Sequence, residues 1–405
     1  MTSLDSPLLP GVATRAEGRP TTLGVLGGGQ LGRMFVHAAQ AMGFRTVVLD
    51  PDGVSPAGQI AHHHIEADYG DADGLAAMAR LCDAVTTEFE NVPAQTLEAL
   101  ARDVPVAPGA QAVAVAQDRA VEKAHLARTA TRSGVAPGPH AVLRAGEALP
   151  ALSADLFPAI LKTARLGYDG KGQVPVHQPE ELASAWAQLK QVNAVLEQRL
   201  ALRDECSVIL ARGHDGTIVH LPVQRNWHHQ GILATTEVAD GLLPASVCDQ
   251  ARAAASAVAE SLDYVGVLCV EFFIVDDGSA DGRLVVNEIA PRPHNSGHYS
   301  MDACDVSQFD LQVRAMASLP LVTPRLHSAA VMLNLLGDVW FDKDSLRAPP
   351  WDQVLALPGV HLHLYGKIEA RVGRKMGHIN ITAPDLAQAR AVAAQVQALL
   401  NLPRP

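Results

Sequence analysis

Two glutamates in the second half of the chain could hold a metal ion. Glu271 lies in "VLCVEFFIV" and Glu288 in "VVNEIAPR", which read as the two strands of a hairpin, and Asn287 stands next to Glu288. A carboxylate with apolar neighbours on both sides is costly to bury unless it has a partner. Two carboxylates and an amide oxygen suit Mg²⁺, whose other positions take phosphate oxygens and water. The pair therefore predicts a site for Mg²⁺ and a phosphorylated ligand, with an exposed acid at a strand end as the alternative.

A lysine and a glycine-rich loop nearer the N-terminus could bind phosphate groups. Lys162 lies in the apolar run "AILKTA", and residues 167–173, "GYDGKGQ", follow at once. A lysine can reach a phosphate as a point charge, although for Lys162 taken alone a surface lysine is the simpler interpretation. Three glycines and charged side chains give a flexible flap whose N–H groups can cover phosphates, whereas a plain hairpin seldom needs so many glycines. Further on, residues 197–200 and Glu205 supply an acid and backbone groups that could hold an adenine edge and a ribose.

The stretch at residues 23–34, "LGVLGGGQLGRM", has the G-x-G-x-x-G spacing of a dinucleotide-binding turn. Gly27, Gly29 and Gly32 would allow a tight turn and bring a phosphate close to a helix N-terminus. Asp50, at the end of the next strand, could hold a ribose hydroxyl. The stretch alone leaves three interpretations open: a dinucleotide site, a site for another phosphate, and a strand-to-helix turn without a ligand.

Two polar segments toward the C-terminus could bind anions. The segment at 290–299, "APRPHNSGHY", follows Glu288 directly, and Arg292 offers the fork of donors that holds a planar oxyanion well. The segment at 365–380 carries four cations that could clamp a phosphate, although for Arg371 we favour a solvated basic face.

Histidines outside these segments give weaker signals. His62–His64 have no supporting ligands around them, so we expect no metal there. His228 and His229 are interpreted as polar loop residues.

The elements that must position these groups change in character along the chain. Strands alternate with helical stretches up to about residue 115, which indicates a parallel, doubly wound sheet. From about residue 157 strand-like runs follow one another, interrupted by an alanine-rich helix at 248–264. A tail from about 330 has short strands and a final helix.

Composition limits the class of protein. The chain has 405 residues and a formal net charge of −11, so a general nucleic-acid binder is disfavoured because it would repel the phosphate backbone. Its five cysteines form no C-x-x-C pair, which suits a reducing cytoplasm. No apolar run is long enough to span a bilayer, and the first twenty residues lack the apolar core of a signal peptide. We therefore expect a cytoplasmic protein that binds neither nucleic acid nor membrane.

A set of motifs resembles a known family. These are "GGGQLGRM", "TTEFENV", "GYDGKGQ", "QGILATTEVA", "NEIAPRPHNSGHY", "SQFDLQVRA", "VMLNLLG" and "GRKMGHIN", which together cover about residues 22–390. Their order, with Lys123, Lys162 and Glu205 between them, resembles that of ATP-grasp enzymes. More closely, it resembles the N5-carboxyaminoimidazole ribonucleotide synthetases, the ATP-dependent carboxylating enzymes of purine biosynthesis.

The resemblance implies an α/β chain of ATP-grasp architecture. A flexible extension at 1–21 would precede an N-terminal doubly wound parallel-sheet (preATP-grasp) domain at 22–130. A central α+β lid would occupy 131–212, and a C-terminal α+β domain 213–405, with a small unit at about 330–400.

The resemblance also implies roles for individual residues. The residues implied for ATP are Arg119, Lys162, Gly167, Tyr168, Asp169, Gly170, Lys171, Gly172, Gln173, Glu197, Gln198, Arg199, Leu200, Glu205, Asn287 and Glu288. Glu271 and Glu288 would bind Mg²⁺. The implied catalytic residues are Tyr168, Asp169, Lys171, Arg292 and His294. The implied acceptor-binding residues are Gly29, Gln30, Leu31, Glu88, Asn295, Ser296, Lys367 and Arg374. Glu90 is interpreted as a local capping acid, and Asp50 then needs no ribose role.

The implied activity is that of a carbon–nitrogen ligase. It would use ATP and bicarbonate to carboxylate 5-aminoimidazole ribonucleotide, through carboxyphosphate, to N5-carboxyaminoimidazole ribonucleotide on the route to IMP. His294 or the departing phosphate would take the proton from the amine. Exposed apolar stretches in the first domain would suit a homodimer.

Three other functions compete with this one. Formate-dependent glycinamide ribonucleotide transformylase would share Glu271, Glu288 and the flap. An NAD-linked oxidoreductase would explain the glycine turn but leave the glutamate pair unexplained. A non-catalytic nucleotide-binding protein would not need the complete set of phosphate and metal groups.

Overall fold

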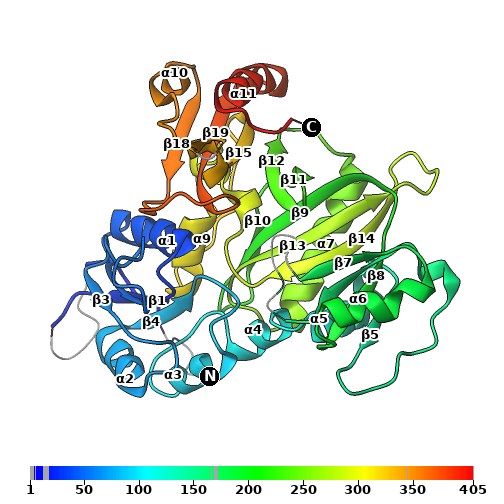
Figure 1. The fold of residues 1–405 in the computed structure, drawn as a ribbon. Helices are drawn as coiled ribbons and strands as arrows, with labels where there is room; N and C mark the ends of the chain where they lie inside the picture. The colour runs from blue at the N-terminus through cyan, green and yellow to red at the C-terminus, as the bar shows by residue number, and fades with distance from the viewer. Residues whose placement is uncertain are drawn as a thin grey trace.

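The N-terminal unit is a parallel sheet flanked by helices, as the alternating pattern predicts. The computed structural model describes residues 4, 6–11, 18–165, 167, 172–343 and 345–404. Four parallel strands lie in the order β3-β2-β1-β4 (Figure 1). The elements are β1 (Thr22–Leu26), α1 (Gln30–Ala41), β2 (Arg45–Leu49), β3 (His63–Ile65), α2 (Ala72–Leu81), β4 (Ala84–Thr87) and α3 (Ala94–Leu100).

Two helices, α4 (Ala110–Ala116) and α5 (Arg119–Ser133), lead from this unit to the rest of the chain. Asp118 caps α5 by accepting hydrogen bonds from the N–H groups of Ala120 and Val121. Gly134 ends the helix in the left-handed conformation, at φ 73°. The cap fixes the position of Arg119 in the first turn of α5.

A small antiparallel sheet follows, in the order β5-β8-β6-β7. Leu161, Leu196 and Trp186 belong to its separate core, so this lid has apolar packing of its own. Its elements are β5 (His140–Leu143), η1 (Ala154–Leu156), β6 (Ala159–Thr163), β7 (Gln173–Val176), η2 (Pro179–Glu181), α6 (Leu182–Gln188) and β8 (Ala194–Gln198).

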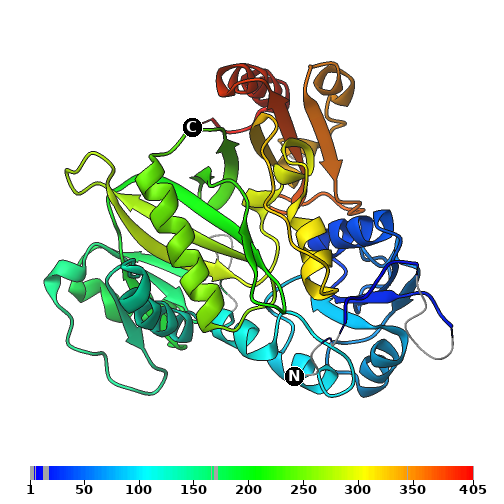
Figure 2. The ribbon, with the colours of Figure 1, turned by 180° about the vertical axis from the view of Figure 1, so that it is seen from behind.

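The largest element is a nine-stranded sheet in the order β14-β13-β9-β11-β12-β15-β19-β18, with β10 paired to β9. The alanine-rich helix α7 lies across its back (Figure 2), where Ala251, Ala255 and Val258 pack on Leu268 and Val270. The strands are β9 (Leu202–Arg212), β10 (Ile218–His220), β11 (Gln224–His229), β12 (Ile232–Val238), β13 (Gly266–Val275), β14 (Arg283–Ala290), β15 (Ala329–Leu336), β18 (Val360–Leu364) and β19 (Lys375–Ala383); α7 is Ala245–Ser261.

The C-terminal unit continues this sheet rather than forming one of its own, because β15 pairs with β12 on one side and with β19 on the other. Its final helix packs on these strands through Ala389 and Val396. Its further elements are η4 (Gly337–Trp340), β16 (Phe341–Asp342), β17 (Ser345–Leu346), α10 (Trp351–Leu355) and α11 (Leu386–Leu400).

A short segment joins the large sheet to the first domain. It contains η3 (Asn295–Gly297), α8 (Ser300–Ala303) and α9 (Gln308–Met316). Phe309 and Val313 of α9 share one core with Phe35 of α1, and the two helices lie side by side in Figure 1. This contact holds the glycine turn, at the start of α1, against the rest of the molecule.

Part of the expected flexible extension lies against the folded chain. Leu8 is buried in the core that contains α1 and α9, and its N–H donates to the carbonyl of Ala317. The hydroxyl of Thr21 donates to the carbonyl of Leu9. Among the described residues, no helix combines the length and apolarity that crossing a membrane requires.

Candidate active site

The two glutamates predicted to act together face each other across the β13–β14 hairpin. Glu271 pairs directly with Glu288, whereas Phe272 pairs with Val286, so Asn287 is the extra residue of a β-bulge. Directly opposite residues of an antiparallel pair project from the same face of a sheet. The hairpin therefore brings both carboxylates together, as the sequence predicts.

Each of these carboxylates already has a partner in the structure. A guanidinium nitrogen of Arg119 lies 3.0 Å from Glu288, and Nε2 of His294 lies 2.9 Å from Glu271. Burial alone would raise the pKa of Glu271, but the nearby His294 holds that pKa well below its ordinary value. Glu271 is therefore ready to act as an anion toward a cation.

The side chain of Asn287, beside Glu288 in the chain, has an oxygen available to a ligand. Its Oδ1 atom is buried and has no hydrogen-bond partner among the described residues. An unsatisfied buried oxygen is costly. A side-chain oxygen without a partner, next to Glu288 in the chain, is the kind of donor that Mg²⁺ takes.

A third glutamate gathers three cations beside the hairpin. The carboxylate of Glu197 lies 3.2 Å from Lys123, 3.3 Å from Lys162 and 3.5 Å from Arg119. Burial would raise the pKa of Glu197, but the three cations lower it to about 2. Burial lowers the pKa of Lys162, and Glu197 opposes that shift. Predicted ATP residues from α5, β6 and β8 are thus brought next to Glu288 on β14.

Two neighbouring residues of α5 hold the strand on either side of Glu288. Lys123, which is only 2% exposed, donates to the carbonyl of Asn287 at 2.8 Å. The carboxylate of Glu122 accepts from the N–H of Ile289 at 2.7 Å. The peptide groups before and after Glu288 are therefore fixed by one turn of helix.

The other residues predicted for ATP lie at the edge of this group. Gln198 donates to the carbonyl of Asp155, and the N–H of Arg199 donates to Pro158. Glu205 pairs with His228, as described below. The carbonyl of Gly172 accepts from the N–H of Thr163, and Gln173 is the first residue of β7. Gly167 is partly buried. The side chain of Leu200 lies near Gly138. Tyr168, Asp169, Gly170 and Lys171, the centre of the predicted flap, lie outside the described residues.

The interpretation of His228 as a loop residue is wrong. His228 belongs to β11, and its Nδ1 lies 2.7 Å from the carboxylate of Glu205. Burial would lower the pKa of His228, but its contact with Glu205 raises it, and Glu271 and Glu288 add to that effect. His228 is partly buried, and the charges of both hairpin acids act on its pKa, so it belongs to the candidate site. The signal that could have found it is the position of "QRNWHH" in an extended stretch.

Two carboxylates of the chain itself accept the hydrogen bonds of the glycine turn. The carboxylate of Glu88 accepts from the N–H groups of Gly29 and Gly32, each at 2.6 Å. Asp50 accepts from the N–H of Gly28 and from the hydroxyl of Tyr69, each at 2.7 Å. Gln30 and Leu31 form the first turn of α1 behind Gly29. The donors that a dinucleotide phosphate would need are therefore taken.

Glu90 is not the local cap that the sequence suggested. Its carboxylate meets Arg292 in a two-pronged ion pair, with Nε–Oε2 at 2.5 Å and Nη2–Oε1 at 3.2 Å. Burial would raise the pKa of Glu90, but Arg292 lowers it to about 2. The prediction failed because the two residues are 202 positions apart. The fork of donors predicted for a planar oxyanion thus holds a carboxylate of the first domain here.

Hydrogen bonds from Ser296 and Gln308 fix the loop that follows β14. Nδ1 of His294 lies 2.9 Å from the hydroxyl of Ser296, which is fully buried. Gln308 accepts from the N–H of His294 and donates to its carbonyl, each at 2.9 Å. Asn295 is also buried, and its Nδ2 atom has no partner among the described residues. Ser296 therefore orients His294, whereas it was predicted to touch the acceptor.

The C-terminal unit reaches the glycine turn. The ammonium of Lys367 donates to the carbonyl of Lys375 at 2.7 Å. Burial raises the pKa of Glu88, and the charge of Lys367 opposes only a small part of that rise. Gly366 lies beside the guanidinium of Arg33 in α1. Arg374 donates to the carbonyl of Glu369 in an exposed loop, where Arg371 pairs with Glu369 as a solvated ion pair. The structure thus brings Lys367 and Glu88 into one region.

Comparisons with known proteins match all three parts of the chain. The ribonucleotide synthetase preATP-grasp domain matches residues 20–117, the ATP-grasp domain 128–309, and the phosphoribosylaminoimidazole carboxylase C-terminal domain 330–392. An N5-carboxyaminoimidazole ribonucleotide synthase of Brucella melitensis is 41% identical over 90% of this chain and 97% of that protein.

Solved structures agree with these matches. A crystal structure of an N5-carboxyaminoimidazole ribonucleotide synthetase in complex with ADP has a TM-score of 0.87 and 36% identity over 98% of this chain and 99% of that one. The Aspergillus clavatus synthase in complex with ADP and 5-aminoimidazole ribonucleotide has a TM-score of 0.82 and 29% identity over 94% of this chain and 98% of that one. The chain therefore belongs to the N5-carboxyaminoimidazole ribonucleotide synthase family of ATP-grasp enzymes.

Proposed function

We propose that this chain uses ATP to carboxylate the exocyclic amine of 5-aminoimidazole ribonucleotide, giving N5-carboxyaminoimidazole ribonucleotide for purine biosynthesis. The observation that carries the proposal is the direct pairing of Glu271 with Glu288 beside Arg119, Lys123 and Lys162. Relatives that bear the name of this activity align over the whole length of these elements.

The nucleotide would lie between the hairpin and the lid sheet. Glu271, Glu288 and the amide oxygen of Asn287 would hold Mg²⁺, which when bound offsets phosphate charge. Arg119 and Lys162, now paired with carboxylates, would turn to the phosphates. The role of these side chains is to position the γ-phosphate and stabilise its charge while an oxygen of bicarbonate attacks phosphorus. The products of this step are ADP and carboxyphosphate.

The acceptor would lie between the glycine turn and the C-terminal unit, where Glu88 and Lys367 meet. Its amine nitrogen attacks the carboxyl carbon of carboxyphosphate, or the CO₂ that carboxyphosphate releases, and phosphate departs. The amine must lose one proton in this step. Nε2 of His294 already lies 2.9 Å from the carboxylate of Glu271. We therefore assign the proton to an oxygen of the departing phosphate and give His294 the role of orienting Glu271.

The flap at residues 167–173 would keep water from carboxyphosphate until the amine attacks. A homodimer and a cytoplasmic location also remain predictions. Both follow from the composition and the exposed apolar stretches described at the outset.

The test is ADP formation by the purified protein with ATP and Mg²⁺, with and without bicarbonate and 5-aminoimidazole ribonucleotide. We expect full turnover only when both are present, with formation of the carbamate product. Turnover that requires formate and glycinamide ribonucleotide would favour the transformylase instead. A change in nicotinamide absorbance would favour an oxidoreductase.

A further inference from the structure

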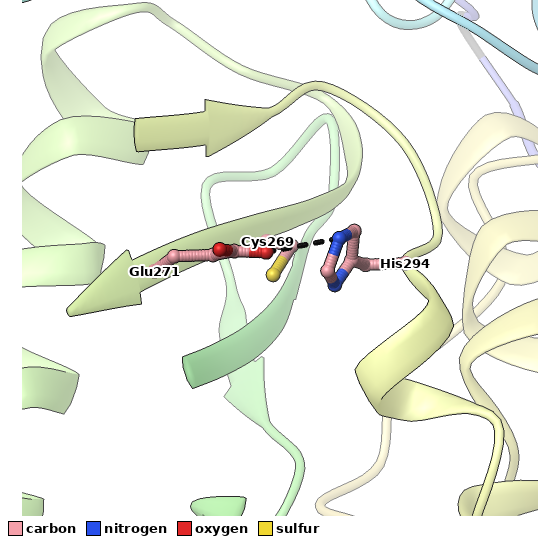
Figure 3. Close-up of side chains that lie close together, drawn as sticks. All are labelled: Cys269, Glu271 and His294. Carbon is pink, nitrogen blue, oxygen red and sulfur yellow. Dashed lines mark ion pairs between the residues drawn. The ribbon is translucent and has the colours of Figure 1, made fainter. Parts of the chain in front are cut away.

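Three side chains beside the hairpin form a ligand set that is too soft for Mg²⁺. The thiol of Cys269, a carboxylate oxygen of Glu271 and a ring nitrogen of His294 all lie within 4.8 Å of one another (Figure 3). Cys269 and Glu271 are two positions apart on β13, so they project from the same face. His294 approaches them from the loop that follows β14. Cys269 is fully buried, and the other two side chains are mostly buried.

The chemistry of these donors points to a transition metal. Thiolate, imidazole and carboxylate together suit Zn²⁺ or Co²⁺, with a fourth position left for water or a substrate oxygen. Bond lengths of about 2.0–2.3 Å separate the donors of a tetrahedral site by roughly 3.3–3.8 Å. A spacing of 4.8 Å or less therefore needs side-chain shifts of about 1 Å and no rearrangement of the backbone.

The imidazole is already turned for this task. Gln224 satisfies its neighbours when its amide oxygen accepts from the hydroxyls of Ser207 and Ser296, at 2.9 and 3.2 Å. Nδ1 of His294 lies 2.9 Å from the hydroxyl of Ser296 and accepts from the N–H of Ser296 at 3.3 Å. Nε2 on the other side of the ring faces the carboxylate of Glu271 at 2.9 Å. A metal ion would lie between Nε2 and the carboxylate, with Ser296 holding the ring in this orientation.

We propose that Cys269, Glu271 and His294 bind a soft divalent cation such as Zn²⁺, and that this ion inhibits the enzyme. Inhibition follows because the ion takes Glu271 away from the site of Mg²⁺ and nucleotide. Binding stands on the geometry alone, whereas inhibition rests on the proposed function.

The first test uses Co²⁺ as a spectroscopic probe on the metal-free full-length protein. Wild type should develop the near-ultraviolet thiolate-to-cobalt charge-transfer absorption, saturating at one Co²⁺ per chain. Cys269→Ser should lose this absorption. Cys304→Ser, which alters another buried cysteine of the same apolar core, should keep it. An absent band in wild type, or a band that survives in Cys269→Ser, would overturn the site.

The second test measures carboxylation in increasing Zn²⁺ at fixed Mg²⁺ and ATP. Cys269→Ser should keep its basal turnover and need at least about tenfold more Zn²⁺ for half inhibition. More Mg²⁺ and ATP should relieve the inhibition of wild type. Equal Zn²⁺ sensitivity of the two proteins would refute the inhibitory role. Binding of ADP checks that the Cys269→Ser protein is folded. If this variant does not fold, Cys269→Ala is used in its place. The cobalt band remains informative even if the chain carboxylates nothing.

Discussion

The hairpin and the glycine turn both bring carboxylates to hydrogen-bond donors, yet they differ in the kind of donor. At the hairpin, Glu271 and Glu288 meet the side chains of His294 and Arg119. At the turn, Glu88 meets the backbone N–H groups of Gly29 and Gly32. A side chain can swing away when a ligand arrives, whereas a backbone N–H at a helix start cannot. In the structure a carboxylate of the chain itself therefore fills the glycine turn, whereas side chains alone hold the hairpin acids that we propose for the nucleotide.

The largest effect is expected at the hairpin. Glu288→Gln keeps the shape of the side chain but removes its charge, so carboxylation should fall by about 10³-fold while the protein stays folded. Steady-state ADP formation and thermal unfolding check this. The exposed Glu180→Gln should behave as wild type, and a Glu288→Gln protein that keeps a tenth of its activity would contradict the assignment.

A second prediction concerns the ion pair that links the two regions. The folded-state pKa of Glu90 is about 2, below its ordinary value of 4.5. The pair with Arg292 therefore contributes stability that is complete above pH 4.5 and is lost as the pH falls toward 2. The contribution is no more than about 3 kcal/mol. Urea unfolding of wild type and Glu90→Gln should show a difference that shrinks with acid over this range; a constant difference would argue against the pair.

At the turn, we expect the loss of the Glu88 carboxylate to lower the stability of the fold and to leave the affinity for ADP almost unchanged. Glu88→Ala leaves two buried N–H groups without an acceptor, which should cost about 2 kcal/mol in the free energy of unfolding. Glu88→Gln keeps one acceptor oxygen and should lose less. Binding of ADP with Mg²⁺ should stay within about twofold of wild type in both. A large loss of ADP affinity would mean that the turn takes part in nucleotide binding.

A smaller effect is expected where α5 holds the strand. Lys123→Met frees the carbonyl of Asn287 and loosens the peptide before Glu288. The apparent affinity for ADP in the presence of Mg²⁺ should fall about tenfold, with less change when Mg²⁺ is absent. Calorimetric titration under both conditions measures this. Equal losses with and without Mg²⁺ would point to a direct phosphate contact instead.

The smallest effect is expected for a substitution in the flap predicted at residues 167–173. Asp169→Ala should raise ATP hydrolysis that is not coupled to carboxylation by a few-fold, about 1 kcal/mol in relative barriers, because water reaches carboxyphosphate. Phosphate release and product formation, measured on the same sample, give the ratio. Asp215→Ala in an exposed turn is the control. If both activities fall together, the flap does not protect the intermediate.

The parts that could be predicted from sequence are those encoded locally. The period of the apolar residues revealed the parallel first domain and the β13–β14 hairpin, and the apolar flanks of Glu271 marked it as a special acid. Contacts between distant segments could not be predicted in this way. Glu90 with Arg292, and Glu205 with His228, depend on how separately patterned units pack. The prediction of residues 168–171 stays a prediction.

The pairing of β15 with β12 has a mechanical consequence. Because the strands that carry Glu271 and those of the C-terminal unit belong to one hydrogen-bonded plate, neither can swing relative to the other without breaking a ladder of backbone bonds. The lid sheet β5-β8-β6-β7 has its own core, and none of its strands, as far as the described residues go, pairs with the large sheet. If the site closes around a ligand, we therefore expect the lid to move and the large sheet to stay rigid.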